Sequence, residues 1–270
     1  MKCLLASVIA VIGLATPAVA AERPTDADVK RLSESIDKGF DVWKEALEKR
    51  NLDDATITSA TGSVDVKRFL NDFEDDIHAF KDRFGKPDSA GPEATALLRR
   101  ASDVERRYRA NPSNTGAAEW SAMSAQFKQL ADGYGAPWPI ESTETRAMRL
   151  SDKELETHLS ALEQNSKQAK KEFDKAMSKD KTAPKGSRDE VKRSFDTFTK
   201  QVNGLRDAVK NGRPGQPQAV TVLASATALG ERSTGLTLSP TGQSVWHSVN
   251  QHCEAIARAF GLPWPQTTAH

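Results

Sequence analysis

The sequence predicts an all-α protein made of two tandem antiparallel four-helix bundles that arose by internal duplication. Two observations point to helices: apolar residues recur every three or four positions along most of the chain, and no long window alternates apolar with polar residues. A third observation points to duplication, because a pattern of roughly 120 residues occurs twice. We therefore expect no β-sheet.

Residues 1–21 have the pattern of a secretory signal peptide, which would be absent from the mature protein. One lysine precedes an apolar run, and Ala18, Val19 and Ala20 fit the small-x-small cleavage rule. No later segment approaches about twenty apolar residues, so we expect a soluble protein in the periplasm or the medium, with no stable membrane anchor after cleavage. Loss of Cys3 leaves Cys253 alone, which excludes an intramolecular disulfide.

The repeat is recognised from segments that match when the chain is shifted by 126 residues. They are GYGAPWP with AFGLPWP, SNTGAAEW with SPTGQSVW, and TDADV with SDKEL. A further pair, VKRFLNDF with VKRSFDTF, matches at a shift of 125. These matches predict a first repeat over 22–140, a linker over 141–150 that lacks Gly and Pro and so allows partial helix, and a second repeat over 151–270.

Each repeat is predicted to contain four helices with apolar stripes. The first begins at Thr25 or Ser151, and SDKE has the form of a capping box. The third follows a Gly- and Pro-rich turn, and the fourth follows S-x-T-G. The core positions expected in the first repeat are Val29, Leu32, Ile36, Phe40, Trp43, Leu47; Val66, Phe69, Phe73, Ile77, Phe80, Phe84; Leu97, Leu98, Ala101, Val104, Tyr108; and Trp120, Met123, Phe127, Leu130, Tyr134.

The repeated Gly-x-Pro-Trp-Pro segments are predicted to end the fourth helices. Gly135 and Gly261 suit the left-handed position just past a helix end, and the following prolines prevent continuation. Trp138 and Trp264 then have two interpretations. Each can fold back as an aromatic plug over its bundle, or each can be an exposed platform that stacks on a sugar or aromatic ligand.

Five arginines on the predicted third helix of the first repeat form a second candidate binding feature. They could dock an anionic partner or cell-wall polymer, or they could be solvated and paired with nearby acids. The residues are Arg99, Arg100, Arg106, Arg107 and Arg109, and only Arg232 corresponds to them in the second repeat.

The segment NDFEDDIHAF is the best candidate for a metal site. Glu74 and Asp75 lie four and three positions before His78, so either pair can share a helix face. Di-iron bundles use carboxylate and imidazole at such spacing. The alternative is a solvated helix face, because the second repeat lacks these residues at the equivalent positions.

Other signatures of catalysis or cofactor binding are missing from the sequence. It has no G-x-S-x-G, P-loop, H-E-x-x-H, C-x-x-C or EF-hand pattern. Without C-x-x-C-H, covalent c-type haem is not expected, and His252 with Met177 is only a weak pair for non-covalent haem. We therefore expect no cofactor.

The charge balance bears on partners. The full chain has a formal net charge of +1, which falls to zero when Lys2 is lost with the leader, so no general attraction to nucleic acid is expected. The leading hypothesis is an exported, non-enzymatic protein that binds an unknown protein, a cell-envelope polymer or a small ligand between or at the ends of its bundles. Two alternatives are a haem or metal carrier that uses the bundle interiors, and an enzyme with a cleft between the bundles.

Overall fold

The computed structural model describes residues 22–52, 55–59, 62–85, 89–180, 186–233 and 236–264. Over these residues the chain is helical apart from one hairpin, which confirms the predicted all-α class. In chain order the elements are α1 (Asp26–Glu48), β1 (Thr56–Ser59), β2 (Gly62–Asp65), α2 (Val66–Arg83), α3 (Gly91–Ala110), α4 (Ala117–Gly133), α5 (Asp152–Lys179), α6 (Ser187–Lys210), α7 (Gln216–Ser233) and α8 (Pro240–Ala259).

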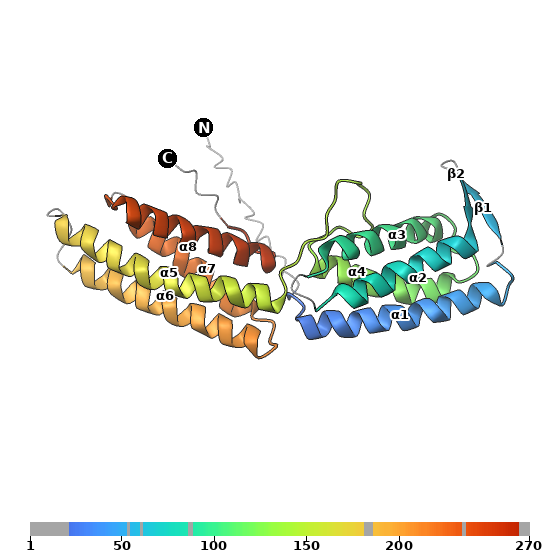
Figure 1. Ribbon diagram of the computed structural model, residues 1–270, viewed down its shortest axis with the longest axis horizontal. Coiled ribbons are helices and arrows are strands. Elements are labelled where there is room, and N and C mark those ends of the chain that lie inside the picture. Colours follow the sequence, from blue (N-terminus) through green and yellow to red (C-terminus); the bar gives the residue numbers. More distant parts are fainter. Residues whose placement is uncertain are drawn as a thin grey trace, which may run out of the picture.

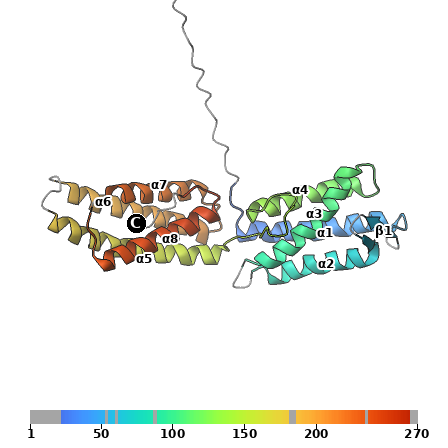
Figure 2. The ribbon, with the colours of Figure 1, turned by 90° about the horizontal axis from the view of Figure 1, so that it is seen from above.

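The eight helices of the described residues pack as two groups, α1 to α4 and α5 to α8. The two groups lie end to end (Figure 1). We call α1 to α4 the N-terminal half and α5 to α8 the C-terminal half. In the first, α1 and α3 each pack beside α2 and α4; in the second, α5 and α7 each pack beside α6 and α8. The view from above shows the same separation, with α1 and α5 starting near the centre (Figure 2).

Each half has its own apolar core, because the stripes of its four helices face one another. The first core is rich in aromatic rings, and the second is mainly aliphatic. Trp120 is buried in the first core, whereas Trp246 is half-buried and packs against the edge of the second. The largest fully buried side chains include Trp120, Tyr134, Phe40, Phe73, Phe80, Phe127, Phe173, Phe195 and Phe198.

Local sequence explains where α1 and α5 begin. The Thr25 hydroxyl accepts a hydrogen bond from the backbone N–H of Asp28, whose carboxylate accepts one from the backbone N–H of Thr25. Ser151 and Glu154 make the same reciprocal pair. These capping boxes satisfy donors that a helix start otherwise leaves unpaired, and they confirm both predicted helix starts.

The Gly-x-Pro-Trp-Pro segments end α4 and α8 as expected. Gly135 and Gly261 have φ values of 61° and 60°, in the left-handed region that favours glycine. The backbone N–H of Ala136 donates to the carbonyl of Ala131 at 2.9 Å, and a bond of the same kind closes the end of α8. These are Schellman motifs, so helix termination explains the repeated glycines.

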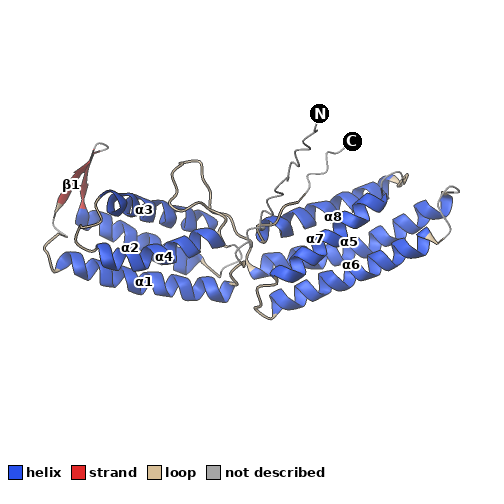
Figure 3. Ribbon diagram, turned by 180° about the vertical axis from the view of Figure 1, so that it is seen from behind, coloured by secondary structure: helices blue, strands red, loops and turns tan. Residues whose placement is uncertain are grey.

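The hairpin corrects the expectation that no strand occurs. Strands β1 and β2 pair antiparallel and stand at the far end of the N-terminal half (Figure 3). Four-residue strands are too short for an alternating pattern to be recognised, although Thr56, Ile57 and Thr58 are β-branched and favour strands.

A smaller correction concerns α8, which begins at Pro240 with Ser239 as its cap, rather than after the S-x-T-G segment.

The linker between the halves is not helical, although its composition allowed partial helix. Backbone N–H groups at Ile140 and in the linker donate hydrogen bonds to side chains of α3 instead. The hydroxyls of Ser102 and Thr95 accept the N–H groups of Ile140 at 2.8 Å and Ala147 at 2.9 Å. Because these groups are bonded to α3, they cannot form helical bonds with one another.

Among the described residues, no helix has the length and apolar character needed to cross a lipid bilayer.

Candidate functional site

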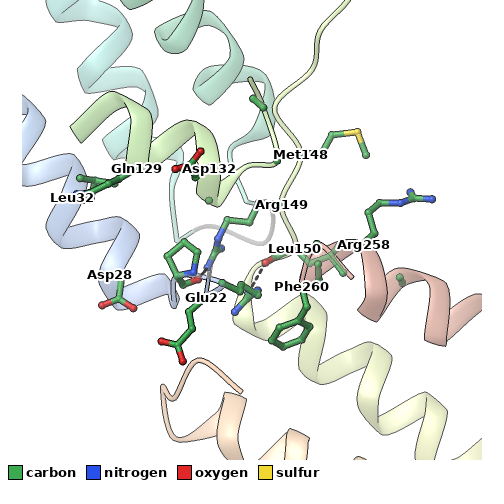
Figure 4. Close-up of a pocket in the computed structure, with 18 of the residues that line it drawn as sticks. Glu22, Asp28, Leu32, Gln129, Asp132, Met148, Arg149, Leu150, Arg258 and Phe260 are labelled. Atoms are coloured by element: carbon green, nitrogen blue, oxygen red, sulfur yellow. Dashed lines mark hydrogen bonds between the residues drawn. The ribbon is translucent and has the colours of Figure 1, made fainter. Parts of the chain in front are cut away.

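The main candidate site is the cleft where the two halves meet, which we call the junction cleft. It has a volume of about 900 Å³. Its walls come from the start of α1, the end of α4, the linker and the end of α8, as the close-up shows (Figure 4). Clefts of this size between structural units are common places for ligands to bind.

The two halves meet through the first residues of α1 and α5. The backbone N–H of Asp26 donates to Oδ2 of Asp152 at 2.9 Å, and the N–H of Asp152 donates to Oδ2 of Asp26 at 3.0 Å. The two residues are 126 positions apart. Each carboxylate thus lies at the N-terminus of the other half's helix, where the unpaired N–H groups and the helix dipole stabilise negative charge.

Two arginines cross the same junction in opposite directions. Arg23 donates to Oδ1 of Asp152 and to the carbonyl of Leu150, both at 2.7 Å. Arg149 donates to the carbonyl of Pro24 at 2.9 Å, and its Nη1 lies 2.6 Å from Oδ1 of Asp26. The two arginine side chains are only 2% and 1% exposed. The positive charges of the two buried arginines therefore neutralise the negative charges of the two carboxylates at the junction.

Burial changes the electrostatics of Arg23. Burial lowers the pKa of Arg23, and the nearby positive charge of Arg149 lowers it further. The carboxylate of Asp152 acts in the opposite direction and raises this pKa. An arginine pKa starts so high that the side chain remains charged. The guanidinium of Arg23 also lies over the ring of Phe260 at 5.8 Å, and that of Arg149 lies over Phe84 at 5.8 Å.

The buried arginines retain unused hydrogen-bond donors. Neither Nε atom, nor Nη1 of Arg149, has a hydrogen-bond acceptor among the described residues, although Nη1 lies close to the Asp26 carboxylate. Figure 4 shows Arg149 reaching across the middle of the cleft. Buried donors without acceptors are unfavourable, and because protein atoms cover them these donors are not accessible from the cleft.

The outer walls of the cleft combine apolar and charged groups. Met148 is 58% exposed, an unusual amount for a large apolar side chain, and the half-buried Leu150 continues the apolar surface. Lys128 pairs with Asp132 at 2.7 Å on α4, so both signs of charge occur at the rim. The cleft therefore suits a ligand that has apolar groups and hydrogen-bond acceptors.

A histidine pair adjoins the cleft in the C-terminal half. His158 lines it, and its Nδ1 lies 3.1 Å from Nδ1 of His252, so α5 and α8 are joined by a hydrogen bond between imidazoles. Burial, and then the neighbouring His158, lower the pKa of His252. The two histidines are 94 positions apart in the sequence, and nothing local to either one indicates that they meet.

The two tryptophans of the repeated segments are both half-buried. The ring of Trp138 stacks on Phe127 with ring centroids 5.7 Å apart and an angle of 21° between the ring planes. Trp264 packs against the edge of the second core. Neither lines the junction cleft, so the cleft site differs from the predicted stacking platform.

Most of the predicted arginines are engaged within the protein. Arg99 donates to the carbonyl of Thr145 at 2.9 Å, and Arg106 donates to that of Ile140 at 2.9 Å, so both hold the linker on α3. Arg232 pairs with Glu190 at 2.7 Å. The structure does not bring these arginines together as one patch, and Arg107 lies instead at a separate cavity.

The predicted metal residues on α2 are also dispersed. Glu74 pairs with Lys44 at 2.8 Å, and Nε2 of His78 lies 3.6 Å from Asp37. Asp75 is exposed. Within the described ranges, no three His, Cys, Asp or Glu side chains gather in a way that could hold a metal ion.

Arg23 and Arg149 were not predicted as site residues, although the sequence carries a signal for them. The segments RPTD and RLSD are 126 residues apart and share Arg, a hydroxyl residue and Asp. The repeat match was recognised only from Thr25 and Ser151 onward. Two more residues upstream would have shown a repeated arginine just before a helix cap.

No family model, curated protein or solved structure matches this chain.

Proposed function

We propose that this chain is an exported, non-enzymatic binding protein of the periplasm, and that its binding site is the junction cleft. We also propose that its halves are duplicated four-helix bundles, with repeats over 22–140 and 151–270 joined by a linker over 141–150. Residues 1–21, on which export depends, lie outside the described residues.

The observation that carries the binding proposal is the pair of buried arginines in a large cleft. Arg23 and Arg149 line a volume of about 900 Å³, together with the cationic side chains of Lys128 and Arg258. These cationic groups favour a ligand with carboxylate or carbonyl oxygens, since hydrogen bonds to charged groups are among the stronger ones. The apolar wall around Met148 favours additional hydrophobic groups on that ligand.

The duplication proposal is supported by the reciprocity at the junction. Asp26 and Asp152, and likewise Arg23 and Arg149, are equivalent at the shift of 126 that relates the repeated segments. Each makes to the opposite half the contact that its equivalent makes in return. This is the relation expected of a two-fold interface, in which one surface patch meets a copy of itself.

The test is a ligand screen by thermal unfolding with free amino acids, short peptides and peptidoglycan fragments as carboxylate-bearing probes. Saturating ligand at about 100 times its Kd should stabilise the protein by about 2.7 kcal/mol. Ala255→Trp, which places a large ring in the cleft, should remove the effect. Ala79→Trp, at an exposed position on α2 outside the cleft, should retain it.

Two results would contradict the cleft proposal. One is stabilisation of the Ala255→Trp variant equal to that of the unmodified chain, which would place the site elsewhere. The other is that no acceptor-bearing probe stabilises the protein while cationic probes do.

Export is tested separately by the intact mass of protein recovered from an exporting host, which should correspond to a chain starting at Ala21 or Glu22. Retention of residue 1 would contradict it.

A further inference from the structure

A second cavity lies at the end of the N-terminal half that is remote from the junction. Its volume is about 390 Å³, which is within the range of small-molecule sites, roughly 300–1,000 Å³. Its lining residues come from the end of α1, the start of α2, the end of α3 and the adjoining loops. Figure 1 shows these helix ends beside the hairpin. The lining residues are Trp43, Leu47, Leu52, Ala55, Val66, Phe69, Leu70, Val104, Arg107, Tyr108, Asn114 and Thr115.

The polar groups of Trp43 and Tyr108, two aromatic residues of this cavity, are already hydrogen-bonded within the protein. Nε1 of Trp43 donates to the Tyr108 hydroxyl at 2.9 Å, and that hydroxyl donates to the carbonyl of Thr115 at 2.7 Å. Gly116 makes this chain possible, because at its φ of 82° a Cβ would lie only 2.8 Å from the Tyr108 oxygen. The ring faces and neighbouring aliphatic groups therefore present an apolar interior.

The one charged group among the lining residues is Arg107. The other arginines of α3 all have partners: Arg99 and Arg106 bond the linker, Arg100 bonds Asp76, and Arg109 bonds Glu105. The side chain of Arg107 has no hydrogen bond or ion pair with the described part of the chain, and the residue is half-buried. An apolar cavity with a single unpaired cation at its wall complements a molecule with an apolar body and one negative charge.

The C-terminal half has different residues at the equivalent positions. A shift of 126 residues places Ala169 at Trp43, Phe173 at Leu47 and Ser233 at Arg107. Phe173 is buried and its ring contacts Trp246 at 5.3 Å. The combination of aromatic wall and cation therefore belongs to the N-terminal half.

We propose that this cavity, which we call the distal cavity, binds a small anionic amphiphile such as a medium-chain fatty acid. The chain of the ligand lies against Trp43, Phe69 and Tyr108, and its carboxylate pairs with Arg107. The site is independent of the junction cleft and does not require the proposed function of that cleft.

Calorimetric titration of the full mature chain tests this proposal, with decanoate below its micelle concentration as the probe. We expect saturable binding of one decanoate per chain, weaker binding of decanol and no binding of decyltrimethylammonium. Arg107→Gln should weaken decanoate about tenfold or more, because it removes a charge-assisted hydrogen bond, and should leave decanol nearly unchanged.

Three further variants complete the design. Arg109→Gln removes a charge from the same helix outside the cavity and should leave decanoate affinity unchanged. Leu52→Trp fills the cavity from a half-buried loop position and should abolish binding. Ala255→Trp, which blocks the junction cleft, should bind decanoate normally, so failure of either site can be recognised separately.

The proposal is overturned if decanoate shows no saturable binding, or if the decyl cation binds equally well. It is also overturned if Arg107→Gln and Arg109→Gln have the same effect, or if Leu52→Trp leaves the affinity unchanged.

Discussion

Asp26 and Asp152 exchange hydrogen bonds, each through its backbone N–H to the carboxylate of the other, at 2.9 and 3.0 Å. Each carboxylate caps the first turn of a helix that belongs to the other half. A side chain would ordinarily cap its own helix, as Thr25 and Ser151 do here. The additional caps therefore couple the start of α1 to the start of α5, and the buried arginines neutralise the carboxylates that provide them.

Replacing Arg149 with Met should destabilise the protein strongly. The side chain is 1% exposed and faces Asp26, so the variant leaves a partly buried carboxylate without its counter-charge. Loss of one partner of a buried pair costs about 3–5 kcal/mol. Urea denaturation followed by circular dichroism measures the change. As a control, Arg31→Met removes an exposed arginine paired to Asp28 and should change the free energy of unfolding by less than about 0.5 kcal/mol. Equal losses in the two variants would argue against a structural junction.

Glu105 should make the N-terminal half sensitive to acid. Burial would raise its pKa, but hydrogen bonds from Ser124, Trp120 and Arg109 outweigh that effect, and the net pKa is lowered. A carboxyl with a lowered pKa in the folded state binds fewer protons there than in the unfolded state. Its contribution to stability is therefore present above the unfolded pKa of about 4.3 and is lost as pH falls through the folded value.

Glu105→Gln tests this contribution. At neutral pH the variant should be less stable by about 1–3 kcal/mol, because a charge-assisted network is replaced by weaker bonds. Between about pH 5 and about pH 3 it should lose less stability than the unmodified protein. Urea midpoints measured across this range give both values. Parallel pH curves for the two proteins would show that Glu105 does not titrate as described.

Cys253 should react very slowly in the folded protein. The thiol is fully buried, and burial raises its pKa to about 12. The thiolate is the reactive form, so at about pH 8 labelling should be about a thousandfold slower than for an exposed cysteine of ordinary pKa. The rate of thiol–disulfide exchange with a chromogenic reagent measures this. A chain with Cys253→Ala and Ser121→Cys, which moves the thiol to an exposed position on α4, is the fast reference. Similar rates, or a disulfide-linked dimer, would contradict the prediction.

Trp138→Ala should destabilise the protein by about 2 kcal/mol, since the ring is half-buried and stacked on Phe127. Trp264→Ala should cost less, because Trp264 makes no ring stacking within the described residues. Thermal unfolding measures both, and Trp138→Phe should restore most of the stability. Should Trp138→Ala remain within about 0.5 kcal/mol of the unmodified protein, the tryptophan would be a surface residue available for recognition rather than a plug.

Local signals made much of the helical architecture predictable. The capping boxes at Thr25 and Ser151 and the left-handed Gly135 and Gly261 depend only on residues a few positions apart. The core stripes follow from the helical period, so the burial of Phe73 and Phe127 was also predictable. The hairpin was missed because its strands are too short to show a period.

The sites depend on contacts that no local pattern describes. Arg23 and Asp152 are 129 residues apart, and only the meeting of the two halves brings them within 2.7 Å. His158 and His252 meet because α5 and α8 pack side by side. The side chain of Arg107 differs from those of the other α3 arginines because no acceptor from the described residues reaches it and a cavity lies beside it. Helix type, caps and core faces are set by interactions within a few turns, and the sequence by itself determined them. The partner of each buried charge and the position of each cavity depend on which faces meet in space, and the tertiary structure alone decided them.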